Sequence, residues 1–203
     1  MTRALANALW GEERGYTLVE LIVVVAILGV VLSGLTTVFV GGSNAEISMN
    51  RRFQAQQQAR LAIDRLRGDI HCASAAQAQT IGTYPGIKLA VANCYSTTPT
   101  ISWCAVQVSA SPARYQLYRS TATSSICTTS DAARVLVADY ITTSAVFTTA
   151  TILQYSLQTV GVDLNVSANP TTTRDAYRLT DSIVARNSTR CLTSGGCTAP
   201  AVP

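Results

Sequence analysis

Apolar residues are spread unevenly along the chain, and their spacing divides it into three parts. Residues 21–40 contain no charged side chain. As a helix, this segment would reach about 30 Å, which is enough to cross the hydrocarbon core of a bilayer. From residue 43 apolar positions recur at helical spacing, and from about residue 81 they follow the shorter period of strands. The pattern predicts a membrane-spanning helix, an amphipathic helix and a β-rich part, in that order.

The amphipathic segment 43–80 contains no proline and is rich in helix-forming residues. Its apolar stripe consists of Ala59, Ile63, Leu66 and Ile70. Ser43 and Glu46 have the spacing of a capping box, which would start a new helix at that point. Alternatively, one long helix continues through Gly41-Gly42 and bends there. We expect this second arrangement.

The β-rich part, residues 81–203, contains short candidate strands separated by turn residues and by Thr- and Ser-rich segments. The candidate strands are 87–94, 101–108, 114–119, 134–140, 152–160, 162–166 and 176–185. The first three should form an antiparallel meander, and residues 193–203 should form a frayed tail. The predicted fold class is α+β, with a long N-terminal transmembrane and amphipathic helix packed on an antiparallel β-sheet head.

Charge adds little to this picture. The net charge is +4, from 15 Lys and Arg against 11 Asp and Glu. These residues are dispersed, and no segment carries the dense basic patch that nucleic-acid binding requires. The charge therefore allows nucleic-acid binding but does not signal it.

Six cysteines follow the apolar segment: Cys72, Cys94, Cys104, Cys127, Cys191 and Cys197. They form no C-x-x-C pair, and the chain has one histidine, so the ligand spacing of a zinc site is absent. No metal or cofactor is predicted. An even number of cysteines on one side of a membrane span indicates disulfides in an oxidising compartment. The alternative is a set of buried free thiols.

No catalytic residue is predicted either. His71 and Cys72 are adjacent, but neighbouring residues on a helix point in different directions and cannot act as a nucleophile and its base. Because His71 is the only histidine, no Ser-His-Asp site can use another one.

Glu20 is a carboxylate at the start of the apolar run, where an unpaired charge is costly and therefore suggests a function. It belongs to the sequence Gly15-Tyr16-Thr17-Leu18-Val19-Glu20-Leu21, which resembles the cleavage and methylation motif of type IV prepilins. The resemblance implies that residues 1–15 are a leader peptide cut off after Gly15. Tyr16 would become the methylated N-terminal residue, with an aromatic ring in place of the commoner Phe. Glu20 would be the filament-assembly residue.

The resemblance also implies the organisation and the partners of the chain. Residues 16–42 would be the transmembrane assembly helix, residues 43–80 its amphipathic continuation and residues 81–203 the head. The partners would be other pilin or pseudopilin subunits, the prepilin peptidase/methyltransferase, an inner-membrane assembly platform and membrane lipid. The chain would cross the cytoplasmic membrane once, with the head outside, and then enter a cell-surface or periplasmic filament. Arginines beyond the span do not favour this orientation, which rests on the resemblance and on the cysteines.

Three further segments narrow the resemblance: 60–67, 115–119 and 183–187. They look like the J-type minor pseudopilins of type II secretion, the PilW-type minor pilins of type IV pili and the F-type subunit of Gram-positive competence pili. A priming or tip position in the filament is implied. The alternatives are a filament-tip adhesin or DNA-binding module and a membrane-anchored surface enzyme, and an ordinary membrane anchor would need neither Gly15 nor Glu20.

The disulfide pairing can be approached from the expected register of the strands. Cys191 and Cys197 enclose a short Gly-Gly turn and can pair locally. If Val108 pairs with Ala113, the continued register brings Cys127 towards Cys94, and the first strand, running back along the helix, places Cys104 beside Cys72. We therefore expect Cys94–Cys127 and Cys72–Cys104. The alternative is Cys94–Cys104 with Cys72–Cys127.

Overall fold

The computed structural model describes residues 15–92, 94, 99–121, 127, 132–149, 152–171, 176–193, 196–198, 200 and 202. The chain forms two compact units, Met1–Ile47 and Ser48–Pro203. A single helix, α1, runs from Leu18 to Cys72 and contributes to both units. The expectation of one long helix is confirmed, and Ser43 does not begin a new one. The bend at Gly41-Gly42 stays a prediction.

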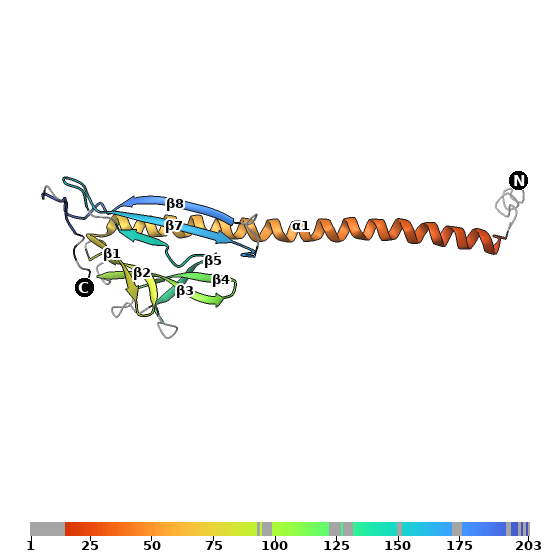
Figure 1. Cartoon of the computed structure of the whole chain (residues 1–203), viewed down its shortest axis with the longest axis horizontal. Coiled ribbons are helices and arrows are strands. Elements are labelled where there is room, and N and C mark those ends of the chain that lie inside the picture. Colours follow the sequence, from red (N-terminus) through yellow and green to blue (C-terminus); the bar gives the residue numbers. More distant parts are fainter. Residues whose placement is uncertain are drawn as a thin grey trace, which may run out of the picture. The chain divides into compact units, whose positions relative to one another are not determined.

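In the described part of the second unit, eight strands follow the helix. They are β1 (Ala75–Ile81), β2 (Tyr84–Ala90), β3 (Thr100–Ala110), β4 (Ala113–Ser120), β5 (Arg134–Ile141), β6 (Phe147–Thr149), β7 (Thr159–Ser167) and β8 (Ala176–Val184). They form one antiparallel sheet with the order β1-β2-β3-β4-β5-β7-β6, and β8 pairs with β7. The sheet curls around the part of α1 that belongs to this unit (Figure 1). The α+β fold class and the antiparallel head are confirmed.

One face of the C-terminal part of α1 forms the centre of the core. Its small and branched apolar residues repeat at helical spacing and are buried: Ala55, Ala59, Ala62, Ile63, Leu66 and Ile70. They pack against alternate positions of the strands, as the period of two in a strand requires. On β3, Trp103 and Ala105 face this core, whereas Cys104 and Val106 belong to a second, smaller cluster.

The end of the helix differs from the expectation. The helix ends at Cys72 instead of continuing to residue 80, and residues 75–81 form β1. This segment is rich in Ala and Gln, which favour helix. Its pairing with β2, from Ala75 with Ala90 to Ile81 with Tyr84, overrides that local preference. Tertiary context decides such cases, because propensity is worth only tenths of a kcal/mol per residue.

Two further expectations about the strands are wrong. Residues 152–160 do not form one strand: Ile152 makes an isolated bridge, and β7 begins only at Thr159. In addition, β6 lies in a segment that reads as a loop because of its threonines.

The described residues of the C-terminal segment do not form the expected frayed tail. The backbones of Ile152 and Cys197 exchange two hydrogen bonds of 2.9 Å, and Val202 is buried. The backbone N–H of Val202 donates to the side chain of Gln77 on β1. These contacts fix parts of the segment 193–203 on the head.

Candidate functional site

The predicted processing and assembly residues lie together at the beginning of α1. Gly15 and Tyr16 precede the helix, and both are exposed. Thr17 caps the helix: its Oγ1 accepts a hydrogen bond of 3.3 Å from the backbone N–H of Glu20, and its carbonyl accepts one of 3.2 Å from Leu21. A Thr followed three residues later by Glu is the signature of a capped N-terminus. The spacing was present in the sequence, but the role of Thr17 was missed.

Glu20 lies in the first turn of α1, where the helix dipole favours a negative charge. Its carboxylate receives one long contact, 3.5 Å from the hydroxyl of Thr17. Within the part of the chain that the structure describes, it has no basic partner. The charge therefore remains available to a cation from another molecule.

The residues that follow Glu20 are apolar and without cover. Every described residue from Leu18 to Val40 is exposed. Most of these residues are valine, leucine or isoleucine, and they cover all sides of this segment of the helix. A helix that is apolar on all sides needs lipid or other helices around it. By length and composition, α1 can cross a membrane.

Three hydroxyl side chains lie within this apolar surface, and each of them is hydrogen-bonded within the helix. The hydroxyls of Ser33, Thr36 and Thr37 donate to backbone carbonyls one turn earlier, at 2.7–2.8 Å. In an apolar medium, polar groups have to find such internal partners. The segment is therefore compatible with a lipid or all-helical environment along its length.

Residues 11–36 match the family model described as the prokaryotic N-terminal methylation motif. The matched segment contains the helix start, Glu20 and most of the apolar surface. The chain is type IV pilin-like. No curated protein and no solved structure matches it. The motif indicates a pilin or pseudopilin type of structural subunit, with processing by a prepilin peptidase and assembly with other pilins.

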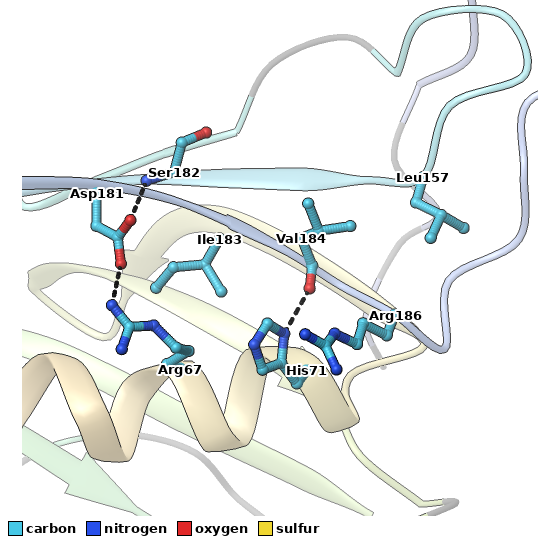
Figure 2. Close-up of a pocket in the computed structure, with 8 residues that line it drawn as sticks. All are labelled: Arg67, His71, Leu157, Asp181, Ser182, Ile183, Val184 and Arg186. Atoms are coloured by element: carbon cyan, nitrogen blue, oxygen red, sulfur yellow. Dashed lines mark hydrogen bonds and ion pairs between the residues drawn. The ribbon is translucent and has the colours of Figure 1, made fainter.

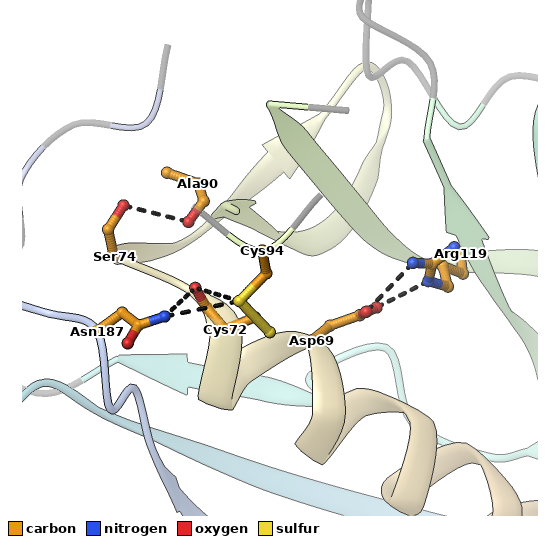
Figure 3. Close-up of a disulfide and its surroundings, with 7 residues drawn as sticks. All are labelled: Asp69, Cys72, Ser74, Ala90, Cys94, Arg119 and Asn187. Carbon is orange, nitrogen blue, oxygen red and sulfur yellow. Dashed lines mark hydrogen bonds and ion pairs between the residues drawn. A yellow bond between two sulfur atoms is a disulfide. The ribbon is translucent and has the colours of Figure 1, made fainter. Parts of the chain in front are cut away.

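In the head of this pilin-like protein, a buried charge ties the helix to the sheet. Asp69 of α1 is only 3% exposed. Its Oδ2 accepts a hydrogen bond of 3.0 Å from Trp103 Nε1. Arg119 donates two more, from Nε to Oδ2 at 2.7 Å and from Nη2 to Oδ1 at 3.2 Å (Figure 3). The hydrogen bond from Trp103 fixes β3 on the helix, and the two from Arg119 fix β4 on it. Sequence reasoning missed this role of Asp69. The signal was a carboxylate at the edge of the apolar stripe of the helix.

All six cysteines are paired. The disulfides are Cys72–Cys94, Cys104–Cys127 and Cys191–Cys197. The pairing expected for Cys191 and Cys197 agrees with the structure. The pairings Cys94–Cys127 and Cys72–Cys104 are wrong, and so is the alternative Cys94–Cys104 with Cys72–Cys127. The idea of free buried thiols is wrong as well, because no cysteine is free.

The missed strand β1 explains why Cys94 meets Cys72. The chain leaves the helix at Cys72 and enters β1, whose first residue pairs with the last residue of β2. The backbone N–H of Ser74 donates to Ala90 O at 2.8 Å (Figure 3 shows these residues beside the disulfide). The end of β2 at Ala90 therefore lies next to the end of the helix, and Cys94 is four positions further along the sequence.

The face of β3 explains why Cys104 cannot reach Cys72. Trp103 points towards the helix, so its neighbour Cys104 points to the other side of the sheet, where Cys127 is buried beside it. The expected pairing of Val108 with Ala113 was also wrong, because Ala113 pairs with Ala110. A bulge between Gln107 and Ser109 then changes the register of β3 against β4 once more. A change of register by one residue moves a side chain to the opposite face.

The residues once considered for catalysis have structural roles. The Sγ of Cys72 is in a disulfide, and His71 Nδ1 lies 2.9 Å from the carbonyl oxygen of Val184. Among the described residues, no group of three or more His, Cys, Asp or Glu side chains is placed to hold a metal ion.

Proposed function

We propose that the chain is a minor pilin or pseudopilin, a structural subunit of a type IV pilus or type II secretion-like filament, in a priming or tip position. The observation that carries this proposal is Glu20, a carboxylate in the first turn of α1 that has no basic partner among the described residues, on a helix whose residues Leu18 to Val40 are all exposed in the described chain. The proposal accounts for both features, because neighbouring subunits supply a cation and apolar helices.

In this proposal a prepilin peptidase cuts after Gly15, and the new amino group of Tyr16 is methylated. The ammonium at Tyr16 of one subunit then neutralises Glu20 of its neighbour. In a medium of low dielectric constant, an unpaired charge is strongly disfavoured, so the pair sets the register of subunit addition. Before assembly the chain crosses the cytoplasmic membrane once, with its disulfide-bonded head on the oxidising side.

The minor position rests on the narrower resemblance of the segments 60–67, 115–119 and 183–187. These segments contain side chains that join the helix to the rest of the head. Arg119 bonds Asp69, and the Asn187 amide donates to the carbonyl of Cys72 at 3.1 Å. Quantitative mass spectrometry of sheared filaments tests the position, because a minor subunit is present at a small fraction of the main one.

Mass spectrometry of the membrane or filament fraction also tests the processing. We expect the mature chain to begin at Tyr16 with an N-methyl group. A protein that begins at Met1, or one cut near Gly42, would contradict the proposal. A Cβ at Gly15 would meet no atom within 4 Å, so Gly15→Val tests recognition by the peptidase and not folding. Gly29→Ala is the control, because Gly29 also has open space around it and lies away from the cleavage site.

A further inference from the structure

A cavity of about 390 Å³ lies in the head between the last turns of α1 and the edge strand β8. Arg67 and His71 enter it from the helix, and Asp181, Val184 and Arg186 enter it from β8 and the residues that follow (Figure 2). The side chain of Leu157 supplies an apolar wall. The cavity therefore combines two arginines and a histidine with one carboxylate and apolar surface.

The carboxylate is already fully used by its neighbours. Asp181 Oδ2 accepts a hydrogen bond of 2.8 Å from Arg67 Nη2, and its Oδ1 accepts one of 2.8 Å from the backbone N–H of Ser182. Arg67 also contacts Asp64 at 3.2 Å. Asp181 and Arg67 thus bind each other at one end of the cavity, so Arg67 is already engaged and is not the group that receives a ligand.

Arg186 is different. Within the described part of the chain, its guanidinium group makes no hydrogen bond and no ion pair. His71 lines the same cavity, and since its Nδ1 donates to Val184 O, its Nε2 has no partner there. Nε2 donates to a ligand only when the ring is protonated. Within the described chain, the guanidinium of Arg186 and the Nε2 of His71 thus have no partner in the cavity.

We infer that this cavity binds a carboxylate group, with Arg186 donating two parallel hydrogen bonds and the protonated His71 donating a third. A planar carboxylate fits the fork of an arginine. Asp181 lies at the other end and repels a second negative charge, so a monoanion is preferred to a phosphate dianion. The apolar wall formed by Leu157 and Val184 accommodates a short hydrocarbon stem.

Two sources share this chemistry: a free carboxylic acid, and an acidic side chain of a neighbouring filament subunit. The second source rests on the proposed function, whereas the binding of a carboxylate does not. An assay on filaments distinguishes the two sources.

The single histidine provides a direct probe of the site. The full chain is labelled with ¹⁵N-histidine in a neutral detergent, and the ring nitrogens of His71 are followed by NMR while butyrate is added at constant pH. We expect a saturable change in the Nε2 chemical shift, with a dissociation constant of roughly 10 mM, in the range open to so small a ligand. Butyramide, the neutral analogue, should cause no such shift.

Arg186→Gln should weaken butyrate binding about tenfold, because a charge-assisted hydrogen bond is lost. Arg190→Gln is the matched control: Arg190 is exposed, lies in the same segment, has no described partner and is not part of the cavity wall. The thermal stability of both variants should equal that of the wild type, since neither arginine has a partner to lose. A shift that does not saturate, or one that is unchanged in Arg186→Gln, would overturn the inference. Tighter binding of inorganic phosphate than of butyrate would overturn its carboxylate specificity.

Recovery in sheared filaments identifies the source of the carboxylate. We expect Arg186→Gln to be recovered less than Arg190→Gln. Equal recovery would overturn the neighbouring-subunit source. Absence of the wild-type protein from filaments would count against the proposed function instead, and the butyrate shift would be unaffected by it.

Discussion

At the scale of single residues, the head depends on charges that join α1 to the sheet. Asp69 is buried and is shared by Trp103 and Arg119, whose side chain is 25% exposed. The neighbouring pair of Asp64 with Arg67 is different, because the Asp64 side chain is 66% exposed. Solvent screens an exposed pair, whereas removing one partner of a buried pair leaves a charge uncompensated. Two carboxylates on one helix should therefore differ widely in their effect on stability.

We predict that Asp69→Asn lowers the free energy of unfolding by about 2–3 kcal/mol, somewhat less than for a fully buried pair. Asp64→Asn should lower it by less than about 1 kcal/mol. Urea unfolding followed by tryptophan fluorescence measures both, because Trp103 is the one tryptophan that follows residue 15. Equal effects of the two substitutions would contradict the role assigned to Asp69.

The second residue-scale prediction concerns Glu20. Glu20→Gln keeps the size of the side chain and removes its charge, so the head should fold and the chain should stay in the membrane. Incorporation into filaments should fall, because the ammonium of a neighbouring subunit loses its partner. Glu46→Gln, a change to an exposed carboxylate later in the same helix, is the control. Recovery of Glu20→Gln from sheared filaments at the wild-type level would refute the assembly role.

At the scale of elements, the sequence predicted the helices and strands that have a strong and local pattern of apolar residues. The length of the uncharged run 21–40 and the stripe Ala59–Ile63–Leu66–Ile70 predicted the long helix. Alternation predicted the strands of the meander and β5 and β8. The end of the helix could not be predicted, because the Ala- and Gln-rich segment of β1 becomes a strand only through its pairing with β2. The N-terminal methylation motif was readable for the opposite reason, because its residues around Glu20 are contiguous in the sequence.

The contact between α1 and β8 gives a prediction about acid stability. The hydrogen bond from Arg67, followed by that from the backbone of Ser182, holds the pKa of Asp181 below its ordinary value despite the opposing effect of burial. A carboxyl group whose pKa is lowered by folding stabilises the folded state above its unfolded-state pKa of about 3.9, and this stabilisation disappears as the pH falls through the folded-state value.

Asp181→Asn should therefore be less stable than the wild type by a constant amount above about pH 5, and the difference should shrink as the pH is lowered below 4. Arg67→Gln removes the main cause of the shift and should show the same trend. Urea unfolding at a series of pH values measures this. A difference that stays constant down to pH 2 would show that the ion pair does not lower this pKa.

At the scale of the whole head, the disulfides follow from the topology of the sheet and could not be read from the spacing of the cysteines. Cys72–Cys94 joins the end of α1 to the segment that follows β2. Cys104–Cys127 lies on the face of β3 that points away from α1. Both depend on β1 and on the face that Trp103 occupies, which are properties of long-range pairing. Cys191–Cys197 needed only a local turn, and it was predictable.

Peptide mapping without reduction tests this connectivity, provided that the chain is cut between Cys94 and Cys104. Trypsin alone cannot distinguish the pairings, because no Lys or Arg occurs between residues 89 and 113, and one peptide would carry both cysteines. Chymotrypsin separates them by cutting after Tyr95 and Trp103. We expect the peptide containing Cys72 to be linked to the one containing Cys94, and that containing Cys104 to the one containing Cys127. A link from Cys72 to Cys104 would place Cys104 on the helix side of β3, which is incompatible with Trp103 bonding to Asp69 from the adjacent position.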